Sequence, residues 1–119
     1  MHGHYILKDK KAVPVDDIIK WATQFESQNR RVAQTELGVP KWKYWLSIIF
    51  GIKRWQPVRI STVFLGLDRQ YGEGEPLIFE TMIFGGELDR EQHRYSTWEQ
   101  AEAGHKAMIE RVKQAQKDL

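Results

Sequence analysis

One pair of side chains in this sequence could support acid–base chemistry. Glu80 is the single carboxylate within the apolar segment LIFETMIF, residues 77–84, and His105 is the polar member of an apolar helical stripe. If the helix packs over the strand face that carries Glu80, the two side chains meet as a Glu–His hydrogen bond, the arrangement of an oriented general base. A structural role for the two side chains is favoured over catalysis, because buried polar side chains commonly satisfy one another's hydrogen bonds. No serine or threonine stands in a nucleophile-like setting, so we predict a protein without catalytic activity.

A small-ligand or nucleotide site is a second function that these side chains suggest. A pocket between the sheet and the C-terminal helix would suit a sequestering protein or a vestigial enzyme, whereas a filled interface there would exclude it. The Gly-x-Gly of residues 72–74 is weak support for a phosphate site, because this loop leads to a strand and not to a helix N-terminus. Asp68 is interpreted as a residue that shapes the loop. The candidate pocket residues are Arg59, Asp68, Glu80, Tyr95 and His105.

The N-terminal histidines are weak candidates for a metal site. His2 and His4 supply two imidazoles, and a third ligand would have to come from His93 or Asp89. Because a protein zinc site takes at least three ligands, two neighbouring histidines do not make one. We predict neither a bound metal nor a cofactor.

The segment KWKYWLSIIFGIKRWQP, residues 41–57, has the most unusual composition in the chain. It holds three of the five tryptophans and four basic residues, with no acidic residue. As a helix it would be apolar nearly all round, which indicates burial or a docked interface. As a pair of strands it would extend the sheet into an arm.

Three roles for residues 41–57 remain open. The segment covers an open face of the sheet, or it is a surface for a protein partner or for self-association, since Trp, Tyr and Arg dominate interface hot spots. The third role is contact with single-stranded nucleic acid or an anionic membrane surface, for which four charges are few. The candidate partner-binding residues are Trp42, Tyr44, Trp45, Phe50, Lys53, Arg54 and Trp55.

Composition and charge narrow the class of protein. With 119 residues, 41% hydrophobic and 29% charged, the chain has the size and make-up of one soluble domain. Outside residues 41–57 it carries 14 basic and 16 acidic residues, which makes nucleic-acid binding by the whole surface unfavourable. The N-terminus lacks the apolar run of a signal peptide, and no stretch approaches the ~20 apolar residues of a membrane span. We therefore expect a cytoplasmic protein without a transmembrane segment.

The hydrophobic patterns predict a single α+β domain. The expected architecture is an antiparallel sheet of four or five strands with two helices packed on one face. Since both faces of LIFETMIF are mostly apolar, we expect the sheet to be covered on both sides. Thr97 and Gln100 fit a capping box at the start of the last helix, and Gly104 within that helix indicates close approach of its backbone to the sheet. The predicted elements are a hairpin of 5–7 and 12–15, helices 16–27 and 97–115, strands 31–37, 58–67 and 77–84, and a charged connector over 87–94.

Three sequence blocks in the second half carry a family resemblance. STVFLGLD, PLIFETMIFGG and RYSTWEQAEAGH resemble near-identical blocks in a family of small uncharacterised proteins encoded by tailed bacteriophages and prophages. The resemblance implies a phage product that acts in a bacterial cytoplasm, and it brings no activity or site residues. In that family RRVAQTELG leads through a short turn into ISTVFLGLD, which implies that residues 39–57 are an insertion.

These observations together predict a phage accessory protein that acts by non-enzymatic binding. Its partner would be a host or viral macromolecule, with counter-defence or host takeover as possible outcomes. Residues 41–57 would form the contact surface or a self-association surface, and nucleic acid is not the favoured partner. The small-ligand pocket stands as the alternative.

Overall fold

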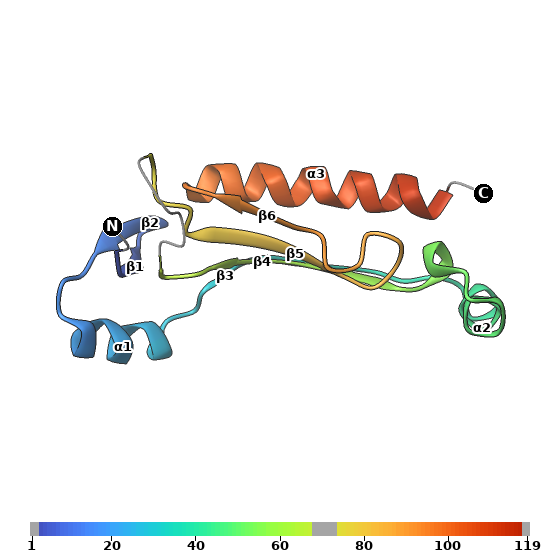
Figure 1. Cartoon of the computed structure of the whole chain (residues 1–119), viewed down its shortest axis with the longest axis horizontal. Helices are drawn as coiled ribbons and strands as arrows, with labels where there is room; N and C mark the ends of the chain where they lie inside the picture. Colours follow the sequence, from blue (N-terminus) through green and yellow to red (C-terminus); the bar gives the residue numbers. More distant parts are fainter. Residues whose placement is uncertain (1–2, 68–73, 118–119) are drawn as a thin grey trace.

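The computed structural model describes residues 3–67 and 74–117, which form an elongated α+β domain measuring 52 × 29 × 22 Å (Figure 1). The predicted α+β class, with an antiparallel sheet and helices packed on it, is confirmed. Its elements are β1 (Tyr5–Lys8), β2 (Lys11–Pro14), α1 (Ile18–Ser27), β3 (Arg31–Leu37), α2 (Lys41–Phe50), the short 3₁₀ helix η1 (Lys53–Trp55), β4 (Val58–Phe64), β5 (Phe79–Phe84), β6 (Gln92–Tyr95) and α3 (Trp98–Lys117).

The described strands form two separate antiparallel sheets. β1 and β2 make the predicted hairpin, whose two turn residues Asp9 and Lys10 both have positive φ, as a tight two-residue turn requires. The larger sheet has the strand order β3-β4-β5-β6, so each strand pairs with its neighbour in the chain. Its register places Ile60 opposite Ile83 and Thr62 opposite Thr81 at the centre of the sheet.

Helix α3 lies along one face of the larger sheet (Figure 1). Its capping box forms as predicted: the Thr97 hydroxyl accepts from the Gln100 backbone N–H at 3.1 Å, and the Gln100 side chain accepts from the N–H of Thr97 at 3.3 Å. The alternate residues of β4 and β5 that face α3 form two apolar clusters with it. The buried members of these clusters are Val58, Ile60, Ile83, Met108 and Val112, and Phe64, Ile78, Phe79 and Ala101.

Helix α1 packs at one end of the sheet, beside the β1–β2 hairpin (Figure 1). Asp17 caps its N-terminus by accepting from the N–H groups of Ile19 and Lys20. The Trp21 indole donates to the Tyr5 carbonyl at 2.8 Å, and Phe25 packs against the cluster that contains Phe64. The helix predicted over 16–27 therefore begins at Ile18, with Asp17 as its N-cap.

The expectation that the sheet is covered on both sides is wrong. The face away from α3 carries Arg59, Glu80, Met82, Phe84 and Arg94, all at least partly exposed, and none of the described helices lies over its middle. Arg94 donates to Glu80 across the strands at 2.9 Å, and the Arg59 guanidinium lies 4.7 Å from the centre of the Phe84 ring. Cross-strand polar pairs and the long arginine side chains partly shield the apolar groups, so this face is stable in contact with water.

Strand β6 lies in the segment that was predicted to be a charged connector. Its sequence, QHRY, has almost no apolar residue because β6 is an edge strand whose side chains are largely exposed. Hydrophobic alternation therefore gave no signal for it.

The glycine within α3 packs as predicted, because a Cβ on Gly104 would overlap the Tyr95 ring of β6. We expect Gly104→Ala to lower the free energy of unfolding by about 1–3 kcal/mol through overpacking, although alanine favours helix by about 1 kcal/mol. In a Tyr95→Leu background, which removes the aromatic ring and its hydroxyl, the same change should be neutral or stabilising. Urea denaturation of the four proteins in this cycle measures the coupling. Equal effects in both backgrounds would show that the ring does not limit position 104.

Candidate functional site

The predicted Glu80–His105 pair does not form. Glu80 lies on the exposed face of β5, where its carboxylate accepts from Arg94, whereas His105 projects from α3 onto the opposite face of the sheet. Successive side chains of a strand point to opposite faces, so Thr81, and not Glu80, is the residue of β5 that lies on the same face as His105. The interpretation of Glu80 and His105 as an oriented general base is therefore wrong.

His105 is held instead by a buried network of threonine hydroxyls. Its Nδ1 lies 2.7 Å from the Thr62 Oγ1, its Nε2 lies 2.9 Å from the Thr35 Oγ1, and Thr62 and Thr81 share a hydrogen bond of 2.5 Å. The His105 side chain is only 4% exposed, and burial lowers its pKa below the usual value. A neutral imidazole can donate through one nitrogen and accept through the other, so the network binds α3 to three strands.

The residues of the predicted ligand pocket do not converge. His105 and Tyr95 lie on the face covered by α3, whereas Arg59 and Glu80 lie on the opposite face; Asp68 is outside the described residues. The space around His105 is filled, since Thr62 and Thr81 are fully buried. The filled interface at His105 therefore excludes the predicted pocket around Glu80 and His105.

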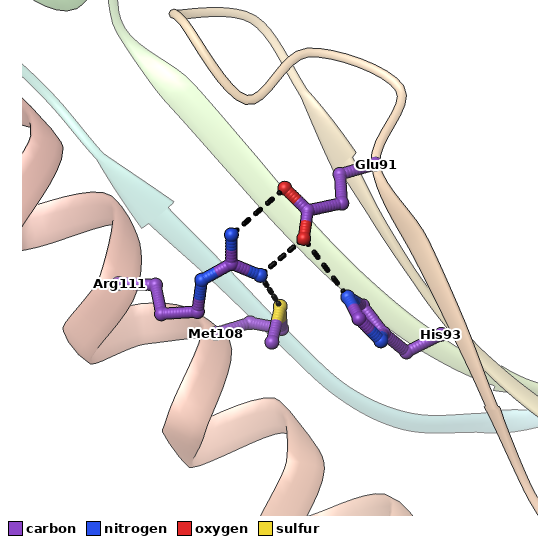
Figure 2. Close-up of polar contacts among 4 residues, drawn as sticks. All are labelled: Glu91, His93, Met108 and Arg111. Atoms are coloured by element: carbon purple, nitrogen blue, oxygen red, sulfur yellow. Dashed lines mark hydrogen bonds and ion pairs between the residues drawn. The ribbon is translucent and has the colours of Figure 1, made fainter.

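An exposed charged cluster connects α3 to the start of β6 (Figure 2). Both oxygens of Glu91 accept from the Arg111 guanidinium, and one also contacts His93 Nε2 at 2.9 Å. Arg111 in addition lies 3.7 Å from the Met108 sulfur. The hydrogen bond from Arg111, followed by that from His93, lowers the pKa of Glu91. Because both carboxylate oxygens accept from one arginine, we interpret the cluster as an ion pair that joins α3 to the start of β6.

The histidines proposed as metal ligands are engaged elsewhere or lie outside the described residues. His93 contacts Glu91, and the Asp89 carboxylate accepts from the Gly85 N–H at 2.7 Å. His4 packs edge-on against the Trp21 ring, and His2 is not described. Within residues 3–67 and 74–117, no three histidine, aspartate or glutamate side chains gather as a metal site would require.

Residues 41–50 form a helix that projects from one end of the sheet. Helix α2 begins after Pro40 and ends at Gly51, whose left-handed backbone (φ 67°) terminates it. Figure 1 shows α2 at the opposite end of the long axis from α1, and its described packing partner is η1. Of the three roles left open for this segment, coverage of the second face of the sheet is therefore excluded.

The apolar side chains of α2 face water. Ser47 is the one buried residue of this fully described helix, and Trp45, Ile49 and Phe50 are 60%, 67% and 68% exposed. We call the exposed set the α2 surface; it comprises Trp42, Tyr44, Trp45, Ile48, Ile49 and Phe50. At about 100° per residue these positions cover well over half of the helix circumference. Burying a side chain of this size in a partner contributes roughly 1.5–3 kcal/mol, so the surface favours association.

The other predicted partner-binding residues lie directly behind this surface. Lys53 is exposed, whereas Arg54 and Trp55 of η1 are partly buried. The Trp55 ring packs edge-on against Trp42, with 6.2 Å between ring centres, and Lys43 lies over both rings. Ile48 and Ile49 were missing from the predicted set, although helical spacing places Ile49 beside Trp42 and Trp45, and Ile48 beside Tyr44.

A comparison of the chain with protein-family models, with curated proteins and with solved structures finds no match. Among the described helices, none combines the length and the apolar character needed to cross a bilayer.

Proposed function

We propose that this protein acts by non-enzymatic binding and that the α2 surface docks on a protein partner. The observation that carries the proposal is the exposure of six large apolar side chains on one ten-residue helix. An amphipathic or apolar helix of this kind binds by laying its side chains into a hydrophobic groove. Trp42, Tyr44 and Trp45 supply the rigid aromatic groups that dominate interface energies.

Charge around the helix indicates the partner's character. Lys41, Lys43, Lys53 and Arg54 flank the α2 surface, and no acidic residue occurs between 39 and 57. Two copies that met through this helix would bring like charges together, whereas a partner with acidic residues around an apolar groove would be complementary. The resemblance to phage-encoded proteins supports a host or phage protein in the bacterial cytoplasm as that partner, with counter-defence or host takeover as the setting.

Site-directed photo-crosslinking tests this proposal. A photoreactive phenylalanine analogue in place of Ile49 is expected to form a covalent adduct with a protein partner in bacterial lysate. The same analogue in place of Ile19 is the matched control, because Ile19 is 76% exposed on α1, at the other end of the molecule. Adding Trp45→Ser to the Ile49 protein should reduce the adduct at least tenfold without changing the circular dichroism spectrum.

Three outcomes would contradict the proposal. Equal adduct yields at positions 49 and 19 would show nonspecific hydrophobic binding at any exposed position. Adducts made solely of two copies of this chain would place self-association at the α2 surface. Nuclease-sensitive adducts would favour nucleic acid as the occupant.

A further inference from the structure

A basic cavity lies behind α2, where three segments distant in the sequence meet. It has a volume of about 390 Å³ and lies against the backbone of residues 38–40. The side chains that line it are Lys43 of α2, Arg54 and Trp55 of η1, and Lys113, Gln116 and Lys117 of α3. Its volume is within the range of small-ligand pockets.

Four of the described lining side chains are cationic and none is acidic. Bringing like charges together is unfavourable unless counter-charge is supplied, and only part of it comes from the protein: Arg54 has Glu87 at 3.7 Å and Lys113 has Glu110 at 3.8 Å, both outside the lining. Lysines near the C-terminus of α3 complement the helix dipole. That effect does not account for the cations that α2 and η1 add to the same cavity.

Unsatisfied hydrogen-bond donors point the same way. Arg54 Nε and Trp55 Nε1 are buried and have no hydrogen-bond partner among the described residues. A buried donor without a partner is unfavourable. Because both atoms are closed to solvent, an anion in the cavity would satisfy them only if the Arg54 or Trp55 side chain turned toward it. The N-terminus of α2 adds to this, because no side chain caps it and Pro40 and Lys43 line the cavity.

We infer that this cavity binds the phosphate group of a phosphorylated ligand. Phosphate suits it better than a carboxylate, because the four cations favour an anion with more than one negative charge and the arginine fork matches phosphate geometry. The volume accommodates a group larger than one phosphate, such as a diphosphate. The cavity shares Lys43 and Arg54 with the basic flank of the α2 surface, whereas none of the six apolar side chains of that surface lines it.

Calorimetric titration with pyrophosphate at constant ionic strength tests the inference. The double variant Lys43→Gln/Lys113→Gln is expected to bind at least tenfold more weakly, since it removes two charge-assisted contacts to the phosphate oxygens. Lys20→Gln/Lys106→Gln removes the same charge from exposed positions outside the cavity and should bind as the parent protein does. Arg54→Lys keeps the charge, loses the fork and should also weaken binding.

A second arm distinguishes the source of the phosphate. Co-sedimentation with phosphatidylglycerol vesicles that is lost in Lys43→Gln/Lys113→Gln, without pyrophosphate binding, would assign the site to a lipid headgroup. Pyrophosphate binding without vesicle binding would assign it to a free phosphorylated ligand. The inference is overturned if neither binds, or if both double variants lose binding equally, since the effect would then be general electrostatics. Ile49→Ser should leave pyrophosphate binding unchanged.

Discussion

Phe79→Ala is expected to lower the free energy of unfolding by about 3–5 kcal/mol, whereas Trp45→Ala should change it by less than about 0.5 kcal/mol. Phe79 is 1% exposed and packs on Phe64, with 5.3 Å between ring centres. It also packs on Trp98, the first residue of α3. Removing its ring leaves a cavity in the core, while Trp45 on α2 loses contact mainly with water. Urea denaturation followed by circular dichroism measures both changes.

Comparing these two alanine substitutions distinguishes a core residue from a residue of the exposed α2 surface. A loss of 3–5 kcal/mol is a large share of the 5–15 kcal/mol of a typical domain, so Phe79→Ala could leave little folded protein. Phe79→Leu, which keeps most of the volume, gives a measurable intermediate. If Trp45→Ala proves as costly as Phe79→Ala, α2 packs into the core and the α2 surface is not available to a partner.

Strands β3, β4 and β5 and helix α3 were predictable because their signals are local, whereas the edge strand β6 was missed. Strand 31–37 has the predicted bounds, and the apolar stripe predicted around His105 is buried in α3, where it comprises Ala101, His105, Met108 and Val112. The capping box at Thr97 also formed as its spacing indicates. Periodicity and capping depend on neighbouring residues, so they can be read without knowing the fold.

The environment of each sheet face was not predictable in the same way. Alternation places Glu80 and Thr81 on opposite faces, but it does not state which face the last helix covers. LIFETMIF is apolar on both sides, so the assignment of α3 to either face was compatible with it. Helix α3 covers the face with Thr62 and Thr81, where His105 finds its hydrogen-bond partners. The register that aligns these two threonines joins residues far apart in the chain, so no local pattern indicates it.

The candidate sites show the same division. Sequence composition identified residues 41–57 as the segment to examine, but it left their burial open, because an all-round apolar helix suits both a core and an interface. The exposure of α2 follows from where β3 and β4 direct the chain. The basic cavity has no local signal at all, since Lys113 and Lys117 join Lys43 and Arg54 through the path of α3 across the sheet.

Acidification from pH 7.5 to 5.5 is expected to destabilise the protein through His105. Burial lowers the pKa of His105 in the folded state, so the unfolded chain binds a proton more readily as the pH falls through the ordinary histidine range near 6.5. The free energy of unfolding is therefore fully retained above that range and declines below it. Glu91, whose pKa is lowered chiefly by Arg111, stays ionised in this window and does not contribute.

His105→Gln should be less stable at pH 7.5 by about 1–3 kcal/mol, because a threonine hydroxyl loses its buried partner, and its stability should vary less between pH 7.5 and 5.5. Urea denaturation at four pH values measures both effects. His93→Gln is the matched control, since His93 is exposed on β6 and the acid sensitivity should persist without it. If His105→Gln keeps the full pH dependence and His93→Gln abolishes it, the buried threonine network is not what opposes protonation. The pH dependence of stability would then arise at the edge of the sheet, where His93 contacts Glu91 and Glu91 accepts from Arg111.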